Sequence, residues 1–192
     1  MRKLKLQMHI TLDGFAGKEN GEMDWMTVDW SRDLHKFTIK NLDDVDYIVI
    51  PFGKKMDDSF FSYWGGTANK PEDPFFEVAK KIMATPKIII SKYPVSKQFP
   101  NTRVIKGDVI NEIKQLKEQT GQYIMAYGGV TFAASLIDND LVDEFYLLSN
   151  PVAIGKGLPI FNGVVDNLLL ELSSSQPDEC GIIVNKYVKR KK

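Results

Sequence analysis

Cysteine and histidine are scarce in this 192-residue sequence, which has one cysteine, Cys180, and two histidines, His9 and His35. A single cysteine excludes an internal disulfide and offers no metal cluster, so we expect no metal site. Lys plus Arg and Asp plus Glu each total 25, and a formal net charge of +0 gives no basic excess for nucleic acid. No apolar run approaches the ~20 residues that span a bilayer, and nothing resembles a signal peptide. We therefore expect a cytoplasmic protein that binds neither membranes nor nucleic acid.

Length and composition predict a single domain over residues 1–192. The sequence is 43% hydrophobic and 26% charged, which is ordinary for a soluble globular protein that buries a core. Apolar and polar residues alternate over residues 4–12, which is typical of a strand. Short apolar runs at 47–50, 87–90 and 123–126 are of the kind found in parallel sheets.

The spacing of apolar residues predicts helices between these strands. The predicted helical segments are 32–42, 72–83 and 108–117, the last capped by Asp108. Residues 59–70 are predicted to form a surface loop. Residues 168–174 and 181–188 are predicted strands with no helix between them, so they should pair antiparallel. The expected fold class is α/β, a three-layer α/β/α domain with a mostly parallel central sheet and an antiparallel C-terminal hairpin.

Residues 123–136 hold the most informative pattern: an apolar run, two adjacent glycines, then apolar residues at helical spacing. This pattern predicts a buried strand, a glycine turn and a helix. A helix N-terminus has unpaired N–H groups and a partial positive charge, and glycine lets an anion approach, so Gly128-Gly129 can hold a phosphate. A tight strand-to-helix turn without a ligand is the alternative.

Two other strand ends carry groups that suit a phosphate, Gly53-Lys54-Lys55 and Ser91-Lys92. In open α/β sheets, ligands lie beyond the carboxyl ends of the strands. Three such ends fit a pyrophosphate plus a 2′-phosphate, which indicates NADPH without the full dinucleotide-binding glycine motif. A solvated loop is the alternative at Gly53-Lys54-Lys55.

Six motifs occur in an order that resembles a known family. They are Leu12-Asp13-Gly14, Gly21-Glu22-Met23-Asp24-Trp25, Ile90-Ser91-Lys92, Tyr127-Gly128-Gly129, Leu141-Val142-Asp143-Glu144 and Pro151-Val152 through Gly155-Lys156-Gly157 to Phe161. Together they resemble the dihydrofolate reductase-like family that contains the bacterial riboflavin-biosynthesis reductase C-terminal domain. The resemblance covers nearly the whole chain. It implies the dihydrofolate reductase-like fold, NADPH as hydride donor and, frequently, a homodimer.

The resemblance also implies a set of cofactor-binding residues at the strand ends and in the loop at 12–17, which would border the nicotinamide. The set comprises Ala16, Gly53, Lys54, Lys55, Ser91, Lys92, Gly128, Gly129, Val130 and Thr131. Within it, the glycine pair would hold the pyrophosphate, with Gly53 and Lys54 on its other side, and Ser91-Lys92 would face the adenosine 2′-phosphate. Many relatives have Gly-Arg-x-Thr where this chain has Gly53-Lys54-Lys55-Met56, and lysine cannot supply arginine's bidentate fork.

Three carboxylates are candidates for a catalytic proton donor. The cofactor supplies hydride, while a carboxyl group in a shielded pocket, its pKa raised by desolvation, can supply the proton. Asp13 is the first candidate, followed by Asp24 and Asp33. A turn residue before glycine is the alternative for Asp13. His9 could be a general acid, although an ordinary sheet position is the alternative.

Aromatic residues in the glycine-rich segment after the first strand are expected to line a substrate pocket. Phe15 and Trp25 are the main candidates, in a region with Trp30 and Trp64, unless the segment packs on its own core. Arg32 can bind an anionic substrate group, with a surface arginine as the alternative.

The leading hypothesis is an NADPH-dependent reductase that transfers hydride to a small heterocyclic or sugar-bearing substrate. It resembles 5-amino-6-(5-phosphoribosylamino)uracil reductase of riboflavin biosynthesis. The alternatives are a dihydrofolate reductase, another small carbonyl or imine reductase, or a nucleotide-binding dimer without catalysis. The departure at Gly53-Lys54-Lys55-Met56 favours the last of these.

Overall fold

The residues of the chain fall into two groups that make most of their contacts within themselves. The computed structural model describes residues 1–53 and 58–190, so Lys54 and Lys55 of the predicted cofactor set lie outside the described residues. The first unit comprises Met1–Arg2 and Arg32–Met125, and the second comprises Lys3–Ser31 and Ala126–Lys192. One domain over the whole chain stays a prediction.

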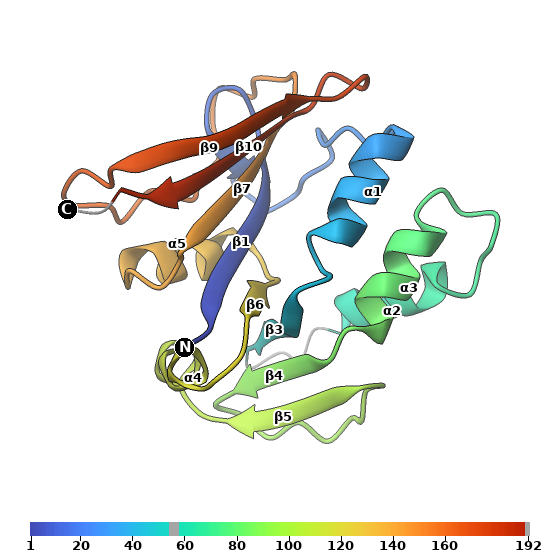
Figure 1. Cartoon of the computed structure of the whole chain (residues 1–192), viewed down its shortest axis with the longest axis vertical. Helices are drawn as coiled ribbons and strands as arrows, with labels where there is room; N and C mark the ends of the chain where they lie inside the picture. Colours follow the sequence, from blue (N-terminus) through green and yellow to red (C-terminus); the bar gives the residue numbers. More distant parts are fainter. Residues whose placement is uncertain (54–57, 191–192) are drawn as a thin grey trace. The chain divides into compact units, whose positions relative to one another are not determined.

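A parallel sheet forms the centre of the first unit (Figure 1). Strand β3 (Val45–Phe52) pairs in parallel with β4 (Lys87–Ser91), and β4 pairs in parallel with β5 (Thr102–Lys106). Strand β6 (Tyr123–Ala126) is the other neighbour of β3. Because β4 is buried along its whole length, its three central residues, Ile88–Ile90, are continuously apolar rather than alternating.

Four helices lie among the described residues of the first unit. They are α1 (Arg32–Lys40), α2 (Ser59–Thr67), α3 (Phe76–Ala84) and α4 (Val109–Glu118). Helices α2 and α3 pack on each other, and α3 also contacts α1. The predicted cap of α4 is confirmed, since Oδ1 of Asp108 accepts hydrogen bonds from the N–H groups of Ile110 and Asn111 at 3.2 Å each.

Helix α2 replaces part of the surface loop predicted for residues 59–70, so that prediction is wrong. Phe60, Phe61 and Trp64 are at most 8% exposed and belong to the main hydrophobic cluster of the unit. Their spacing is helical, but Gly65 and Gly66 weaken the local signal, since glycine costs about 1 kcal/mol in a helix interior. Burial of three aromatic side chains outweighs that cost. Trp64 is therefore a core residue and not part of a ligand pocket.

The second unit combines parallel and antiparallel pairing. Strand β1 (Lys3–Ile10) is parallel to β7 (Glu144–Ser149), which pairs antiparallel with β10 (Ile183–Lys189). Strand β10 pairs antiparallel with β9 (Leu170–Pro177), which confirms the predicted C-terminal hairpin. Helix α5 (Val130–Asp138) contributes Val130, Phe132, Ala133, Leu136 and Ile137 to the buried residues of this unit.

The second unit also contains a two-stranded sheet that was not predicted from the sequence. Strand β2 (Phe15–Gly17) pairs antiparallel with β8 (Leu158–Pro159). Gly157 permits this approach, because a Cβ atom at that position would lie 2.3 Å from the carbonyl oxygen of Gly17. The pairing fixes the segment after β7 against the segment after β1, and the latter segment carries the predicted site residues Asp13, Phe15 and Ala16.

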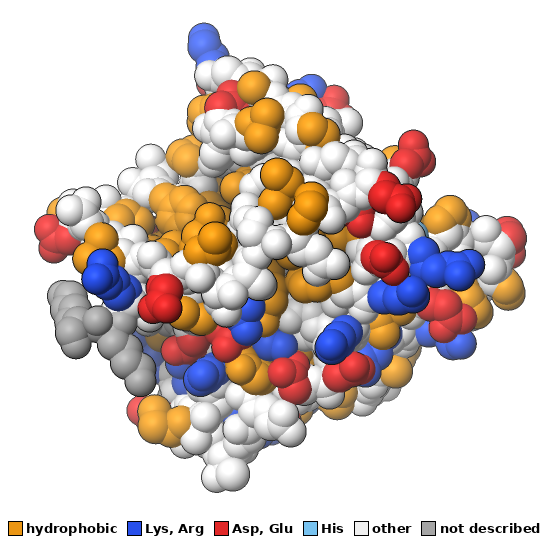
Figure 2. All heavy atoms as spheres, turned by 45° about the horizontal axis from the view of Figure 1, so that its top comes forward, with side chains coloured by type: hydrophobic (Ala, Val, Ile, Leu, Met, Phe, Trp, Pro, Cys, Tyr) orange, Lys and Arg blue, Asp and Glu red, His pale blue; other side chains and the backbone are white. Residues whose placement is uncertain are grey.

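Parallel strands joined through helices, followed by an antiparallel pair, confirm the mixed α/β class. Within residues 1–53 and 58–190, no helix is both long and apolar enough to cross a membrane. On the face drawn in Figure 2, Lys and Arg side chains are interspersed with Asp and Glu, in keeping with the formal net charge of +0.

Candidate functional site

The carboxyl ends of β1 and β7 are adjacent in the second unit, where Ile10 is the register partner of Ser149. Asn150 follows β7 and is 0% exposed. Its Nδ2 donates to the carbonyl oxygens of Leu148 at 2.9 Å and Ile10 at 3.3 Å, and its Oδ1 accepts from the backbone N–H of Thr27 at 3.0 Å. One buried amide therefore joins both strand ends to the segment that precedes α1.

His9 lies beside this amide on β1. Its Nδ1 is 3.2 Å from Nδ2 of Asn150, and its ring stacks on Trp30 with centroids 5.4 Å apart. Burial lowers the pKa of His9 to about 4, while the hydrogen bond with Asn150 acts in the opposite direction. A neutral imidazole whose Nδ1 accepts the Asn150 hydrogen bond fits this geometry. The structure therefore favours an ordinary sheet position for His9 over a general acid.

Asp13 lies directly after β1 and is held by its own neighbours. Its carboxylate accepts hydrogen bonds from Oγ1 of Thr11 at 2.6 Å, from the N–H of Ile154 at 3.1 Å and from the N–H of Gly155 at 2.7 Å. The Thr11 bond is the main cause of the lowered pKa of this exposed carboxyl; desolvation acts in the opposite direction, and the backbone bonds from Gly155 and Ile154 add to the lowering. The raised pKa expected of a shielded acid is wrong for Asp13, and the group instead fixes the loop after β7.

The other two candidate acids are also exposed and paired. Asp24 lies 2.7 Å from Nζ of Lys18, and that bond is the main cause of its lowered pKa. Asp33 lies in the first turn of α1 and pairs with Lys36 at 3.1 Å. The prediction that the acid lies in a shielded pocket is therefore wrong for both carboxylates. Arg32, the first residue of α1, is exposed as well.

The start of α5 is the part of the predicted cofactor set that the second unit brings together. Gly129 is the N-cap, and no described atom lies within 4 Å of the place where a Cβ would stand. A Cβ added to Gly17 would lie 3.3 Å from Cγ2 of Val130, so strand β2 with its buried Ala16 runs past the helix start. The first backbone N–H groups of α5 therefore have an uncapped, open approach next to β2, which fits an anionic group.

The first unit brings together the other predicted strand ends. Gly53 and Lys92 follow Phe52 and Ser91, which are register partners on β3 and β4. The space around a Cβ at Gly53 is also open within 4 Å among the described residues. Ser91 is buried, and its Oγ accepts from the N–H of Tyr93 at 3.1 Å. This edge thus presents an open backbone at Gly53 and the cation of Lys92.

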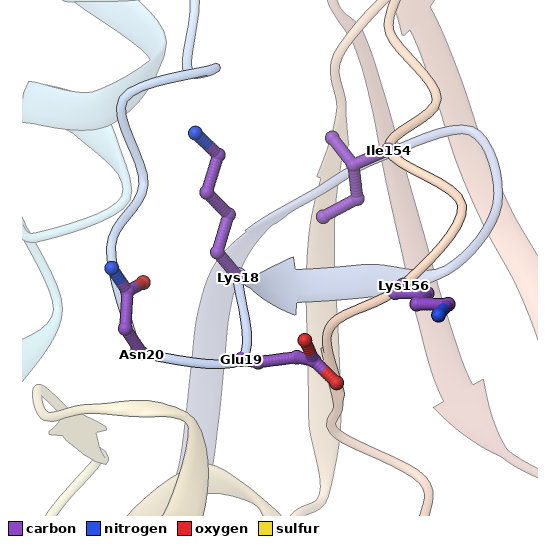
Figure 3. Close-up of a pocket in the computed structure, with 5 residues that line it drawn as sticks. All are labelled: Lys18, Glu19, Asn20, Ile154 and Lys156. Atoms are coloured by element: carbon purple, nitrogen blue, oxygen red, sulfur yellow. The ribbon is translucent and has the colours of Figure 1, made fainter.

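A hollow of about 380 Å³ lies in the second unit between the segments that flank β2 and β8. It is lined by Lys18, Glu19, Asn20, Ile154 and Lys156 (Figure 3). The first three residues follow β2, and the other two come from the segment before β8. Ile154 points toward Lys18, whereas the ammonium groups of Lys18 and Lys156 point apart. Lysine, glutamate and amide groups make this a polar hollow of mixed charge.

The predicted substrate residues lie near this hollow in sequence but differ in their contacts. Phe15 is half-buried on β2 opposite Pro159. Trp25 is also half-buried, and its indole Nε1 has no hydrogen-bond partner among the described residues although that atom is buried. A buried donor without an acceptor is unfavourable, so Trp25 is suited to meet a ligand acceptor once its segment adjusts.

Sequence reasoning missed Asn150 and the partner of Lys92. Asn150 directly follows the apolar strand β7, and a polar residue at the carboxyl end of a strand is the signal that could have identified it. Nζ of Lys92 lies 2.7 Å from Oδ2 of Asp108. No local sequence pattern indicates that pair, because it depends on the register of β4 with β5.

Comparison with known proteins adds a family and a fold to this geometry. Residues 2–184 match the family described as the RibD C-terminal domain. The uncharacterized protein YyaP of Bacillus subtilis (strain 168) is 30% identical over 189 residues, which cover 97% of this chain and 94% of YyaP.

Two solved structures superpose on nearly the whole chain. One is the diaminohydroxyphosphoribosylaminopyrimidine deaminase/5-amino-6-(5-phosphoribosylamino)uracil reductase of Thermotoga maritima, with a TM-score of 0.62 at 14% identity over 98% of this chain and 57% of that chain. The other is dihydrofolate reductase from Enterococcus faecalis, solved with NADP(H), with a TM-score of 0.54 at 17% identity over 98% of this chain and 97% of that chain. At these identities the likeness shows the fold, which is dihydrofolate reductase-like as the sequence motifs indicate.

Proposed function

The chain belongs to the RibD C-terminal domain family, and we propose that it is an NADPH-dependent reductase of a small heterocyclic or sugar-bearing substrate. The observation on which the proposal rests is the open start of α5 at Gly129, beside β2. The Thermotoga maritima structure, whose name includes a 5-amino-6-(5-phosphoribosylamino)uracil reductase, supports an oxidoreductase of this kind. A cytoplasmic location is part of the same proposal.

In each unit, the predicted cofactor residues include groups that suit a phosphate. In the second unit, Gly128 and Gly129 with the N–H groups of Val130 and Thr131 are proposed to hold the pyrophosphate, and Ala16 is proposed to border the nicotinamide. In the first unit, Ser91 and Lys92 are proposed to meet the adenosine 2′-phosphate. The open backbone at Gly53 suits a phosphate on the same edge. The E. faecalis dihydrofolate reductase solved with NADP(H) supports this choice of cofactor.

Bound NADPH would supply the hydride, so the protein needs to orient the substrate and let a proton reach it. Because the pKa of Asp13 is lowered, we assign this carboxylate the task of fixing the loops at 12–17 and 154–155, with solvent water as the proton source. The indole Nε1 of Trp25, which has no hydrogen-bond partner among the described residues, is proposed to donate a hydrogen bond to a carbonyl oxygen of the heterocyclic substrate. Phe15 and Arg32 stay proposed substrate contacts, and Asp24 and Asp33 stay secondary candidates for the acid.

A homodimer through the C-terminal hairpin is also part of the proposal. Strand β9 is an edge strand of its sheet, and among the described strands its neighbour is β10. Leu172 on β9 is 53% exposed, and Leu169 next to the strand is 58% exposed. An exposed edge strand with apolar side chains is a natural template for pairing with a second copy.

The test is a titration of the purified protein with NADPH followed by a substrate screen. We expect NADPH to bind and to be oxidised when a phosphoribosylamino-uracil substrate is added, with dihydrofolate and simple carbonyl compounds as comparisons. Binding without oxidation by any of these would support the second candidate, a nucleotide-binding protein without catalysis. That candidate is favoured by the exposed, low-pKa carboxylates at 13 and 24. Failure of NADPH to bind would contradict both.

A further inference from the structure

The carboxyl ends of β4 and β5 carry charges of both signs. Ser91 and Lys106 are register partners, and the N–H of Gly107 donates to the carbonyl oxygen of Ser91 at 3.0 Å. Lys92 therefore follows β4 next to the turn at 107–108 that starts α4. This is the edge of the first unit where the proposed function needs to recognise the ribose end of the cofactor.

Asp108 uses its two carboxylate oxygens for different partners. Oδ1 accepts from the N–H groups of Ile110 and Asn111 at 3.2 Å each, and Oδ2 lies 2.7 Å from Nζ of Lys92. The pair is accessible, since the Lys92 side chain is 64% exposed and the Asp108 side chain 39%. The bond with Lys92 is the main reason that the pKa of Asp108 is lowered, so the carboxylate is charged at neutral pH.

A second carboxylate lies close to the same turn. A Cβ added to Gly107 would lie 2.4 Å from Oε1 of Glu112, which shows how closely the Glu112 side chain covers the turn. Two cations, Lys92 and Lys106, are thus matched by two anions, Asp108 and Glu112, at the described ends of β4 and β5. Counting only the described residues at these two strand ends, a dianionic 2′-phosphate arriving at Lys92 would meet no net positive charge.

The two forms of the cofactor differ only at this point. NADPH carries a 2′-phosphate, which is attracted by lysine and repelled by a carboxylate. NADH carries a 2′-hydroxyl, which can donate a hydrogen bond to a carboxylate, as the acidic residue does in dinucleotide-binding folds. Resting on the NADPH-binding function proposed above, we propose that Asp108 is a specificity-determining residue that limits the preference for NADPH and lets NADH bind at the same site.

Asp108→Asn isolates this effect. Asparagine is as good an N-cap as aspartate, so the hydrogen bonds to the start of α4 are kept while the charge is lost. Asp43→Asn is the matched control, because Asp43 is an exposed carboxylate of the same unit that pairs with Lys81 at 2.6 Å. Asp43 precedes β3, whereas Lys92 follows β4. Because these strands are parallel, the two residues lie at opposite ends of the strands. Lys92→Gln removes the cation itself.

The experiment measures dissociation constants of NADPH, NADH and adenosine 2′,5′-bisphosphate by fluorescence and calorimetry, without turnover. We expect the unmodified protein to bind NADPH and NADH within about tenfold of each other. Asp108→Asn should tighten NADPH and the bisphosphate roughly three- to tenfold and leave NADH equal or weaker, because a partly screened repulsion is removed. Lys92→Gln should weaken NADPH and the bisphosphate, and Asp43→Asn should change nothing.

The outcomes separate this inference from the proposed function. If the unmodified protein binds dinucleotides but Asp108→Asn shifts NADPH and NADH equally, or neither, the role of Asp108 is overturned while the proposed function stands. If the unmodified protein already prefers NADPH by more than about a hundredfold, the role of Asp108 is likewise overturned. If it binds neither dinucleotide, both proposals fail. Equal melting temperatures of the variants show that binding, and not folding, has changed.

Discussion

Helices α4 and α5 both begin just beyond a strand, yet their first N–H groups meet different partners. At α4, the carboxylate of Asp108 accepts hydrogen bonds from the N–H groups of Ile110 and Asn111, and it also pairs with Lys92. At α5, the cap is Gly129, which has no side chain and an open space around it. One helix start is capped by an anion of the chain itself, and the other has no side-chain cap.

The strand ends of the two units also differ in charge and in exposure. In the first unit the end of β4 carries an exposed ion pair, whereas in the second unit the ends of β1 and β7 carry the buried amide of Asn150 and the neutral ring of His9. Exposed charges respond to salt and to a charged ligand, while buried neutral groups fix geometry. Under the proposed function, we therefore assign cofactor selection by charge to the first unit and positioning of the reacting groups to the second.

Introducing a carboxylate at the N-cap of α5 should remove the difference between α4 and α5. Of all the variants, we expect this one to have the largest effect on NADPH affinity. Gly129 has φ −71° and ψ 174°, which any residue adopts, so Gly129→Asp should fold and cap α5 as Asp108 caps α4. We expect NADPH affinity to fall at least about a hundredfold, because the new carboxylate occupies the phosphate position and repels it. Calorimetric titration measures the loss.

Gly129→Asn is the control for this variant, since it has the same size and capping ability without the charge. It should lose less affinity than Gly129→Asp. Undiminished NADPH binding by Gly129→Asp would show that the start of α5 does not hold the pyrophosphate.

Removing the buried amide should destabilise the second unit far more than removing the exposed cation affects the first. Asn150→Ala leaves the carbonyl oxygens of Leu148 and Ile10 and the N–H of Thr27 without their partner, at a cost of about 2–4 kcal/mol in free energy of unfolding. Lys92→Gln should leave stability nearly unchanged, because an exposed ion pair contributes little. Urea denaturation measures the free energy of unfolding of both variants. Equal values would contradict the predicted difference between the buried amide and the exposed cation.

The neutral ring of His9 should make stability fall in mild acid. Its pKa is lowered from 6.5 to about 4, so the unfolded chain binds a proton more readily than the folded one between these values. Stability is therefore fully present above pH 6.5 and falls by up to about 3 kcal/mol as the pH drops to 4. The carboxylates with lowered pKa, such as Asp108, lose their contribution only below their usual value of 3.8.

His9→Gln keeps an acceptor for Asn150 but cannot titrate, so its stability should be flat between pH 6.5 and pH 4. Denaturation curves at several pH values test this prediction. The same pH dependence in His9→Gln and in the unmodified protein would assign the effect to another group.

The smallest expected effect concerns Asp13. Asparagine keeps one acceptor oxygen but cannot serve Thr11, Ile154 and Gly155 together, so the loop after β7 should loosen. We expect Asp13→Asn to lower turnover about two- to tenfold and to leave NADPH affinity unchanged. Loss of turnover by a hundredfold or more would instead identify Asp13 as the catalytic proton donor.

Elements with a local pattern could be predicted, whereas those that depend on distant partners could not. Alternation identified β1, the apolar run and glycine pair identified β6 and α5, and the cap at Asp108 identified α4. Helix α2 was missed because its evidence is the burial of aromatic side chains in the core, which outweighs Gly65 and Gly66.

The same limit applies to the candidate site. The glycines at 53 and 129 were identified from the sequence, and the described residues leave open space around both. The other predicted site residues came from the family motifs and stay predictions. The hydrogen bonds that Asp13 accepts from residues 154 and 155 could not be predicted, since these partners reach it only through the fold. The hydrogen bonds of Asn150 likewise depend on the pairing of β1 with β7.

The most direct test of a cofactor site at the strand ends is to follow the backbone amide resonances of the labelled protein during titration with NADPH. We predict the largest chemical-shift changes at Gly128–Thr131 in the second unit and at Ser91–Lys92 in the first, with little change along β9 and β10. Shifts confined to β9 and β10, or none anywhere at saturating NADPH, would contradict the assignment.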